Sequence, residues 1–165
     1  MINKSISKTA SQILKKASAY KQTIAAAESC TGGLLALHLS DAPGASNSFS
    51  GAVVAYTERA KIEILNVNAE IIKNCGVVSE EVASLMAKGA LQKFACDWAI
   101  STTGYSGPTG GTAMAPLGTL CIAISGPEGT KTQRYLLENL SRAQHQEKSC
   151  ELALKLFLEM LNSQE

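Results

Sequence analysis

Apolar positions along the chain follow two patterns, a helical period and short continuous runs. Helical spacing predicts helices at residues 6–20, 34–39, 58–65, 79–94 and 147–161. A shorter helix is predicted between an Asn68 cap and Gly76. Continuous runs predict buried strands at 23–27, 49–56, 98–103 and 119–125, and an edge strand at 132–137. Because strands alternate with helices, residues 1–165 are predicted to form one α/β domain, a sandwich with a central sheet covered by helices.

Composition argues against several classes of protein. The formal net charge is +1, whereas nucleic-acid-binding domains usually carry a strong basic excess, so no nucleic-acid partner is expected. No apolar run reaches the roughly 20 residues that span a membrane, so no membrane partner is expected either. The five cysteines are odd in number and lack CxxC spacing, which argues against a disulfide framework or a zinc site. Free thiols favour a cytoplasmic protein.

The available catalytic side chains favour serine–lysine chemistry. His38 and His145 are the only histidines, so a Ser-His-Asp triad has little material, and no histidine pair or carboxylate cluster predicts a metal site. Ser29 lies where a buried strand turns toward a helix, beside Gly32 and Gly33. Backbone amides at a helix start are unpaired and could stabilise a developing negative charge there. The alternative is that Ser29 or Thr31 is only an N-cap.

A cysteine, a tyrosine and a lysine complete this hypothesis. Cys30 is interpreted as a small structural residue whose side chain points away from that of Ser29, although it remains among the candidate contacts. Tyr56 ends a strand and Lys61 lies one turn into the next helix, so both can reach the sheet edge where Ser29 lies. A lysine base needs its pKa lowered by about 3 units from about 10.4, which requires a desolvated or cationic site. Tyr56 could relay a proton between the serine and the lysine. An exposed helix lysine is the alternative.

A glycine-rich loop forms a second candidate element. The segment from Thr103 to Gly111 follows a strand and includes Gly104, Gly107 and Gly110. Such a density of glycine predicts unusual backbone angles and amides free to hold an oxyanion or a phosphate. The loop matches neither the Walker loop nor GxGxxG, and an ordinary long turn is the alternative.

Together these segments resemble the CinA C-terminal domain family, the nicotinamide-nucleotide amidohydrolases, over about Ser11 to Leu161. The resemblance is carried by the order and spacing of several short stretches: Ala27-Glu28-Ser29-Cys30-Thr31-Gly32-Gly33, Pro43-Gly44-Ala45-Ser46, Phe49 through Gly51 to Tyr56, Ala60-Lys61, Gly76-Val77-Val78-Ser79-Glu80, Gly107-Pro108-x-Gly110-Gly111 and Pro116-Leu117-Gly118-Thr119.

The resemblance implies hydrolysis of the carboxamide of nicotinamide mononucleotide to nicotinic acid mononucleotide and ammonia. It implies that Ser29, Tyr56 and Lys61 are catalytic, with Lys61 deprotonating Ser29 and loop amides stabilising the oxyanion. It also implies that the substrate contacts come from the two glycine-containing segments, from Ser46 and from Arg142. No metal or organic cofactor is implied, and a homo-oligomer is expected.

The sequence departs from the family pattern in two places. Leu140-Ser141-Arg142 stands where Gly-Asp-Arg is common, and Gln146 stands where a second arginine is common. Arg142 is therefore expected either to bind the substrate phosphate or to be a surface charge. Tyr105-Ser106 replaces a common Ile-Ala pair, and the phenol could reshape the pocket. Two alternatives stay open: a catalytically silent homologue that binds a nucleotide or a partner, and an amidase for another small amide.

Overall fold

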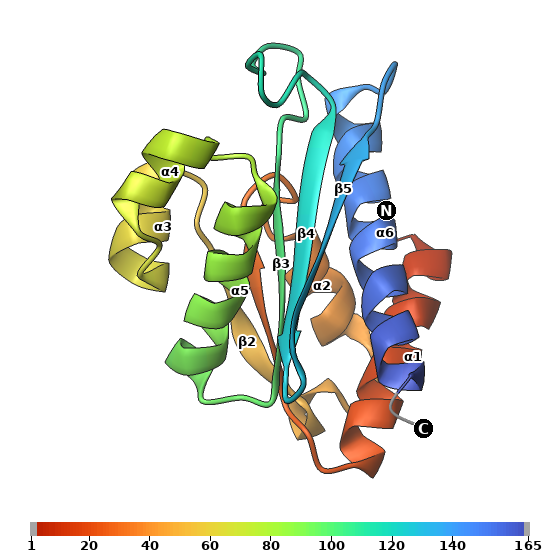
Figure 1. Ribbon diagram of the computed structural model, residues 1–165. Coiled ribbons are helices and arrows are strands. Elements are labelled where there is room, and N and C mark those ends of the chain that lie inside the picture. Colours follow the sequence, from red (N-terminus) through yellow and green to blue (C-terminus); the bar gives the residue numbers. More distant parts are fainter. Residues whose placement is uncertain (1–2, 164–165) are drawn as a thin grey trace.

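A five-stranded mixed sheet forms the centre of the molecule (Figure 1). The computed structural model describes residues 3–163. The strands run in the order β2-β1-β3-β4-β5, and β2, β1 and β3 are parallel while β4 and β5 are antiparallel to their neighbours. Their bounds are Ile24–Glu28 for β1, Phe49–Val54 for β2, Trp98–Gly104 for β3, Thr119–Gly126 for β4 and Gly129–Leu136 for β5.

Helices cover both faces of this sheet, as the alternation of patterns predicted (Figure 1). One face is covered by α1 (Lys4–Ala19), α2 (Leu34–Asp41) and α6 (Arg142–Asn162). The other is covered by α5 (Glu80–Phe94), with α3 (Glu58–Leu65) and α4 (Ala69–Cys75) packed beside it. A short 3-10 helix, η1 (Ala45–Asn47), precedes β2. None of the helices between residues 3 and 163 combines the length and the apolar character of a membrane span.

Two separate apolar cores lie on the two faces, and their side chains differ in size. The core under α1, α2 and α6 contains large residues such as Ile13, Trp98 and Phe157. The core under α5 is built mainly of small ones, including Ala25 and Ala27. Small side chains let a helix approach the sheet closely. Because α5 lies close to the sheet, α3, which packs beside α5 and carries Lys61, also lies near the edge of the sheet.

One glycine makes this close packing possible. A Cβ atom at Gly89 in α5 would lie 2.1 Å from the carbonyl oxygen of Leu65, at the end of α3. The two helix backbones therefore touch, and no larger residue fits between them. This contact fixes the position of α3 relative to the sheet.

The largest error in the predicted boundaries concerns the terminal helix. It begins at Arg142, five residues before the predicted start, because Ser141 and Gln144 form a capping box at its N-terminus. Residues 142–146 are mostly polar, so their sequence shows no apolar period. The first helix likewise starts earlier, after an Asn3 cap, and the edge strand β5 spans Gly129–Leu136 rather than 132–137. The predicted caps at Asn68 and Ser79 are confirmed.

Candidate active site

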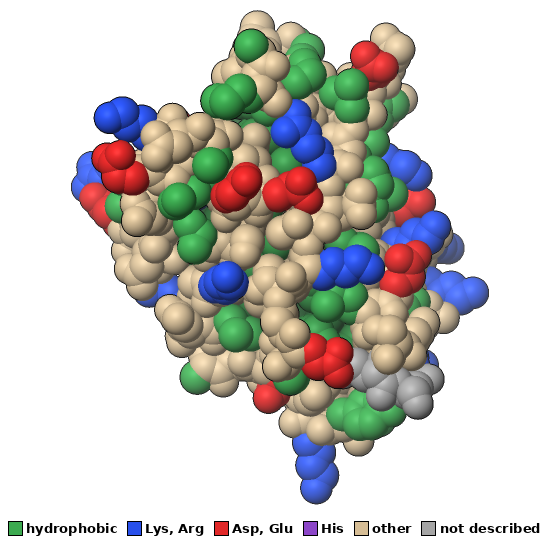
Figure 2. Space-filling view, in the orientation of Figure 1, with side chains coloured by type: hydrophobic (Ala, Val, Ile, Leu, Met, Phe, Trp, Pro, Cys, Tyr) green, Lys and Arg blue, Asp and Glu red, His purple; other side chains and the backbone are tan. Residues whose placement is uncertain are grey.

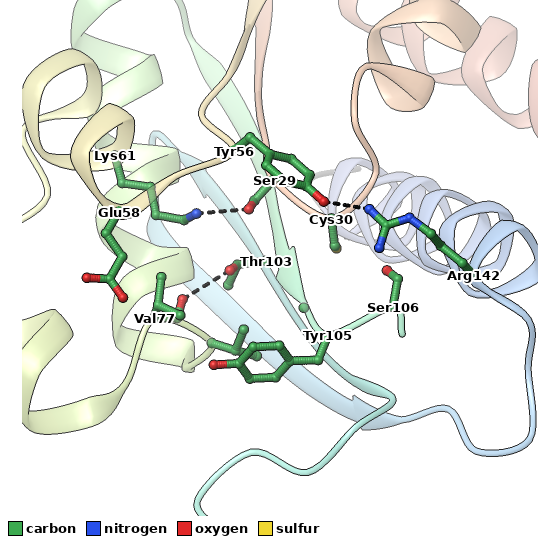
Figure 3. Close-up of a pocket in the computed structure, with 12 residues that line it drawn as sticks. Ser29, Cys30, Tyr56, Glu58, Lys61, Val77, Thr103, Tyr105, Ser106 and Arg142 are labelled. Atoms are coloured by element: carbon green, nitrogen blue, oxygen red, sulfur yellow. Dashed lines mark hydrogen bonds between the residues drawn. The ribbon is translucent and has the colours of Figure 1, made fainter. Parts of the chain in front are cut away.

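The carboxyl ends of three parallel strands bring the candidate residues to one edge of the sheet. Glu28, at the end of β1, pairs with Val54 of β2 and with Thr102 of β3. The segments that follow these strands therefore emerge side by side. They line a pocket of about 210 Å³, drawn in Figure 3, together with residues of α3, of the loop before α5 and of α6: Ser29, Cys30, Tyr56, Glu58, Lys61, Val77, Val78, Thr103, Gly104, Tyr105, Ser106 and Arg142.

The amine of Lys61 lies against the hydroxyl of Ser29. Its Nζ donates to Ser29 Oγ at 2.8 Å and to the carbonyl oxygen of Ala55 at 3.0 Å. Lys61 is only 1% exposed, so the alternative of an exposed helix lysine is wrong. Burial lowers the pKa of this amine to about 8, although Cys30 and Glu58 act in the opposite direction. About half of the amine is therefore neutral at pH 8 and about a tenth at pH 7.

Glu28 holds the turn that presents Ser29, and sequence reasoning missed its role. Its fully buried carboxylate accepts hydrogen bonds from the backbone amides of Gly33, Leu35 and Ala36 and from Thr31 Oγ1. It therefore caps α2 in place of a hydroxyl, and the alternative that Ser29 or Thr31 is the N-cap is wrong. A carboxylate ending an otherwise apolar strand is the signal that could have revealed it.

Replacing Glu28 with alanine is expected to lower the free energy of unfolding by about 3 kcal/mol, because several buried donors lose their charged acceptor. Urea denaturation of the variant and the wild type measures this change. Glu63→Ala is the matched control, since Glu63 pairs with Arg59 on the surface at 2.7 Å with its side chain 57% exposed. Its removal should change the free energy by less than about 1 kcal/mol. Equal effects of the two substitutions would contradict the capping role.

The backbone amide of Cys30 remains available for an oxyanion. The sequence predicts this role for the first amides of α2, but Glu28 occupies those of Gly33, Leu35 and Ala36. Within residues 3–163, the Cys30 amide donates no hydrogen bond to another residue. It directly follows Ser29 and lines the pocket, which is where an oxyanion donor is needed.

Cys30 itself is suited to packing and not to nucleophilic attack. Burial raises the pKa of its thiol to about 12, so the thiol stays protonated at neutral pH. This agrees with the interpretation of Cys30 as a structural residue. Its side chain packs in the core under α1, α2 and α6, while the residue also borders the pocket.

Tyr56 is placed differently from what a proton relay requires. Its hydroxyl accepts a hydrogen bond from Arg142 Nη2 at 2.5 Å, and Arg142 Nη1 donates to the carbonyl oxygen of Gly107 at 2.8 Å. Within the described part of the chain, Tyr56 makes no hydrogen bond to Ser29 or Lys61, and its side chain is largely exposed. Tyr56 and Arg142 therefore form one wall at the pocket mouth (Figure 3). Arg142 is a charged lining residue and not an isolated surface charge.

The glycine-rich loop divides between two cavities. Thr103 and Gly104 line the first pocket, and Thr103 Oγ1 donates to the carbonyl oxygen of Val77 at 3.0 Å. Gly107 lines an adjoining pocket of about 270 Å³, which shares Tyr105, Ser106 and Arg142 with the first. The loop therefore connects the two cavities.

Several predicted contacts lie outside both cavities, among them Gly32, Gly33, Gly110 and Gly111. Gly110 and Gly111 shape the far end of the loop, where a Cβ on Gly111 would lie 2.6 Å from the amide nitrogen of Leu117. Thr31 lines neither cavity, because its hydroxyl is used by Glu28 and Thr102.

Ser46 lies away from the site altogether. It belongs to η1, which precedes β2 and therefore lies at the amino end of the parallel strands. The pocket lies at their carboxyl ends, so Ser46 cannot contact a substrate held next to Ser29 in the same molecule. The sequence resemblance around Ser46 does not reveal this, because a short motif does not record at which end of the sheet it lies.

Surface charge on one face of the molecule is mixed. On the face shown in Figure 2, basic and acidic side chains are interspersed and do not gather into a region of one sign. Within residues 3–163, no group of three or more His, Cys, Asp or Glu side chains is arranged to hold a metal ion. The groups in this pocket that can act on a carbonyl carbon include the Ser29 hydroxyl, the Lys61 amine and the Cys30 amide.

Fold and site together define an α/β domain with a mixed five-stranded sheet and a buried serine–lysine pair at the carboxyl ends of its parallel strands. The chain belongs to the CinA C-terminal domain family, whose model matches residues 6–161. This confirms the resemblance seen in the sequence.

Relatives share this domain within longer proteins. A CinA-like protein of Mycolicibacterium gilvum is 44% identical over 141 residues, which is 86% of this chain and 33% of that protein. A CinA-like protein of Mycobacterium tuberculosis is 45% identical over 139 residues, 84% of this chain and 32% of that protein. The chain thus spans about a third of the length of the curated relatives it matches.

Solved structures have the same architecture. The competence/damage inducible protein CihA of Agrobacterium tumefaciens is 31% identical and superposes with a TM-score of 0.92, covering 98% of both chains. A CinA superfamily protein of Escherichia coli is 29% identical with a TM-score of 0.91, covering 97% of this chain and 94% of that one.

Proposed function

We propose that this domain hydrolyses the carboxamide of nicotinamide mononucleotide, releasing ammonia and nicotinic acid mononucleotide. The observation that supports it most is the 2.8 Å contact between the buried Lys61 amine and the Ser29 hydroxyl. A buried amine with a lowered pKa destabilises a fold, and such groups cluster at functional sites. In this geometry the Lys61 amine can activate the Ser29 hydroxyl as a nucleophile.

The reaction follows from the placement of these groups. Neutral Lys61 accepts the hydroxyl proton while Ser29 Oγ attacks the amide carbon, and the oxyanion forms beside the Cys30 amide. The lysine ammonium then returns the proton to the nitrogen, ammonia leaves, and an ester to Ser29 remains. Water, deprotonated by Lys61, attacks that ester, and the bond between the acyl carbon and Ser29 Oγ breaks. Lys61 then returns the proton to Ser29 Oγ, and the product leaves as the carboxylate.

The combined size of the two cavities suits a substrate as large as a nucleotide. Ligand pockets for drug-sized molecules usually enclose about 300–1,000 Å³. The pocket at Ser29 has about 210 Å³ and its neighbour about 270 Å³, so only the two together reach this range. Arg142 borders both and offers a positive charge for a phosphate.

The pH dependence of kcat/KM tests the assignment of the base. Because the protonated amine cannot accept a proton, we expect kcat/KM to rise about tenfold per pH unit at low pH and to level off above about pH 8. Glu58→Gln should move this midpoint to lower pH, since Glu58 raises the pKa of Lys61. If Glu58→Gln does not change the midpoint of the pH profile of kcat/KM, the assignment of Lys61 as the base is contradicted.

One observation favours the second candidate, a homologue that binds nucleotides without turning them over. Gln146 donates to the carbonyl oxygen of Cys30 at 3.0 Å and supplies no charge for a phosphate. Measuring ammonia release and binding of nicotinamide mononucleotide in parallel separates the two candidates. Release with turnover supports the hydrolase, and binding without release supports the silent homologue. Release from a different amide only would support the third candidate, an amidase with another substrate.

A further inference from the structure

A second serine faces the pocket opposite Ser29, and a buried histidine holds it. Ser106 follows β3, is 7% exposed, and lies on the Arg142 side of the pocket, across from Lys61 (Figure 3). Its Oγ lies 2.8 Å from Nδ1 of His145, which belongs to α6 and is 1% exposed. The hydrolysis described above uses neither residue.

The other ring nitrogen of His145 determines which way the Ser106 hydroxyl points. Nε2 lies 3.2 Å from the carbonyl oxygen of Gly118, which can only accept, so Nε2 carries the proton. Burial, assisted by the charge of Arg142 and opposed by the Gly118 contact, lowers the pKa of His145 below its ordinary value. The ring is therefore neutral at pH 7, and Nδ1 accepts the proton of Ser106, whose contact of 2.8 Å is shorter than the 3.3 Å contact of Ser149 with the same atom. The lone pairs of the Ser106 oxygen remain free for the pocket.

Ser106 lies at the junction of the two cavities. It lines both the pocket at Ser29 and the adjoining pocket bounded by Gly118, Leu140 and His145. A molecule that places its carboxamide at Ser29 and extends into the second pocket passes Ser106 with its middle part. In a mononucleotide that part is the ribose, whose hydroxyl groups are hydrogen-bond donors.

We propose that Ser106, oriented by His145, accepts a hydrogen bond from a ribose hydroxyl of the substrate and so selects nucleotides over free amides. This inference rests on the proposed function, because it takes the amide end to lie at Ser29. Ser106 is then a substrate-binding residue, and His145 is a positioning residue that keeps the serine an acceptor.

The test compares nicotinamide mononucleotide with its 2′-deoxy and 3′-deoxy analogues. Ser106→Ala should raise KM for the natural nucleotide about tenfold with little change in kcat, as expected for one lost hydrogen bond. With the wild type, one of the two deoxy analogues should show the same tenfold increase in KM. Ser106→Ala should not raise the KM of that analogue any further.

Ser149→Ala is the matched control, because Ser149 Oγ lies 3.3 Å from the same Nδ1 but Ser149 lines neither cavity. Its KM should stay within about twofold of the wild type.

The outcomes separate this inference from the hydrolase proposal. Two results would overturn the role of Ser106 and leave the hydrolase proposal intact. One is turnover with the same KM for the wild type and Ser106→Ala. The other is that Ser106→Ala raises KM for both deoxy analogues as much as for the natural nucleotide. If the wild type releases no ammonia, calorimetry on the Ser29→Ala background replaces KM with Kd. On that background, adding Ser106→Ala should weaken Kd for the natural nucleotide about tenfold and leave Kd for one deoxy analogue unchanged. This result supports the inference although hydrolysis has failed. Absence of nucleotide binding overturns both.

Discussion

Ser29→Ala is expected to reduce ammonia release from nicotinamide mononucleotide by at least about a thousandfold, because it removes the atom that attacks the amide carbon. Binding should persist, since the alanine leaves the rest of the cavity in place. A coupled ammonia assay gives the rate, and calorimetry gives Kd for the same protein samples. The combination of lost turnover with a Kd within about threefold of the wild type is the expected signature.

Ser101→Ala is the matched control for this substitution. Ser101 is also a buried serine, in β3, but its Oγ donates to the carbonyl oxygen of Ala83 at 2.6 Å and lines neither cavity. We expect Ser101→Ala to lower stability and to keep its rate within about threefold of the wild type in folded protein. Activity of Ser29→Ala near the wild-type level would refute the assignment of the nucleophile.

Lys61→Met is expected to abolish activity and at the same time to stabilise the fold at pH 7. The amine is buried with its pKa lowered from 10.5 to about 8, which corresponds to a destabilisation of about 3 kcal/mol below pH 8. Methionine removes this penalty but leaves Ser29 and the carbonyl of Ala55 without their donor. A net gain of about 1–2 kcal/mol at pH 7 is therefore expected, with a loss of rate of about a thousandfold.

The sign of the pH effect makes this prediction specific. Between pH 8 and pH 10.5 the unfolded chain holds a proton on Lys61 that the folded chain has lost, so this group makes the wild type more stable as pH rises. The advantage of Lys61→Met should thus shrink by about 2 kcal/mol between about pH 7 and pH 9.5. Buried thiols such as Cys30 act in the opposite direction, because burial raises their pKa, but the variant shares them.

Urea denaturation at pH 7 and pH 9.5 measures the stability gained by Lys61→Met and how much of that gain is lost as pH rises. Lys73→Met, on the exposed side of α4, is the control and should leave both the rate and the pH dependence close to those of the wild type. An advantage of Lys61→Met that is the same at both pH values would show that the amine is not held neutral by the fold.

The convergence of Ser29 and Lys61 could be predicted because it follows from rules of topology. A strand that ends at Ala27 or Glu28 and another that ends near Tyr56 deliver the next residues to the same sheet edge if the strands are parallel. The structure pairs β1 with β2 in parallel. One turn of α3 then directs Lys61 back toward that edge.

Other contacts depend on long side chains whose direction the sequence does not reveal. The hydroxyl of Tyr56 could have reached Ser29 or Arg142, and the structure places it against Arg142. The pairing of Ser106 with His145 joins residues 39 positions apart, from a loop and a helix with no shared pattern. Such contacts are fixed only when β3 and α6 are packed against each other.

The sequence by itself determined the layers of this protein, since apolar periodicity records which face of each element is removed from water. It also determined which residue types were available for catalysis. Only the tertiary structure decided that Glu28 caps α2, that Lys61 is desolvated beside Ser29, and that Ser46 lies at the opposite end of the sheet from the pocket. Burial and hydrogen-bond partners arise between segments distant in sequence, so no local pattern records them.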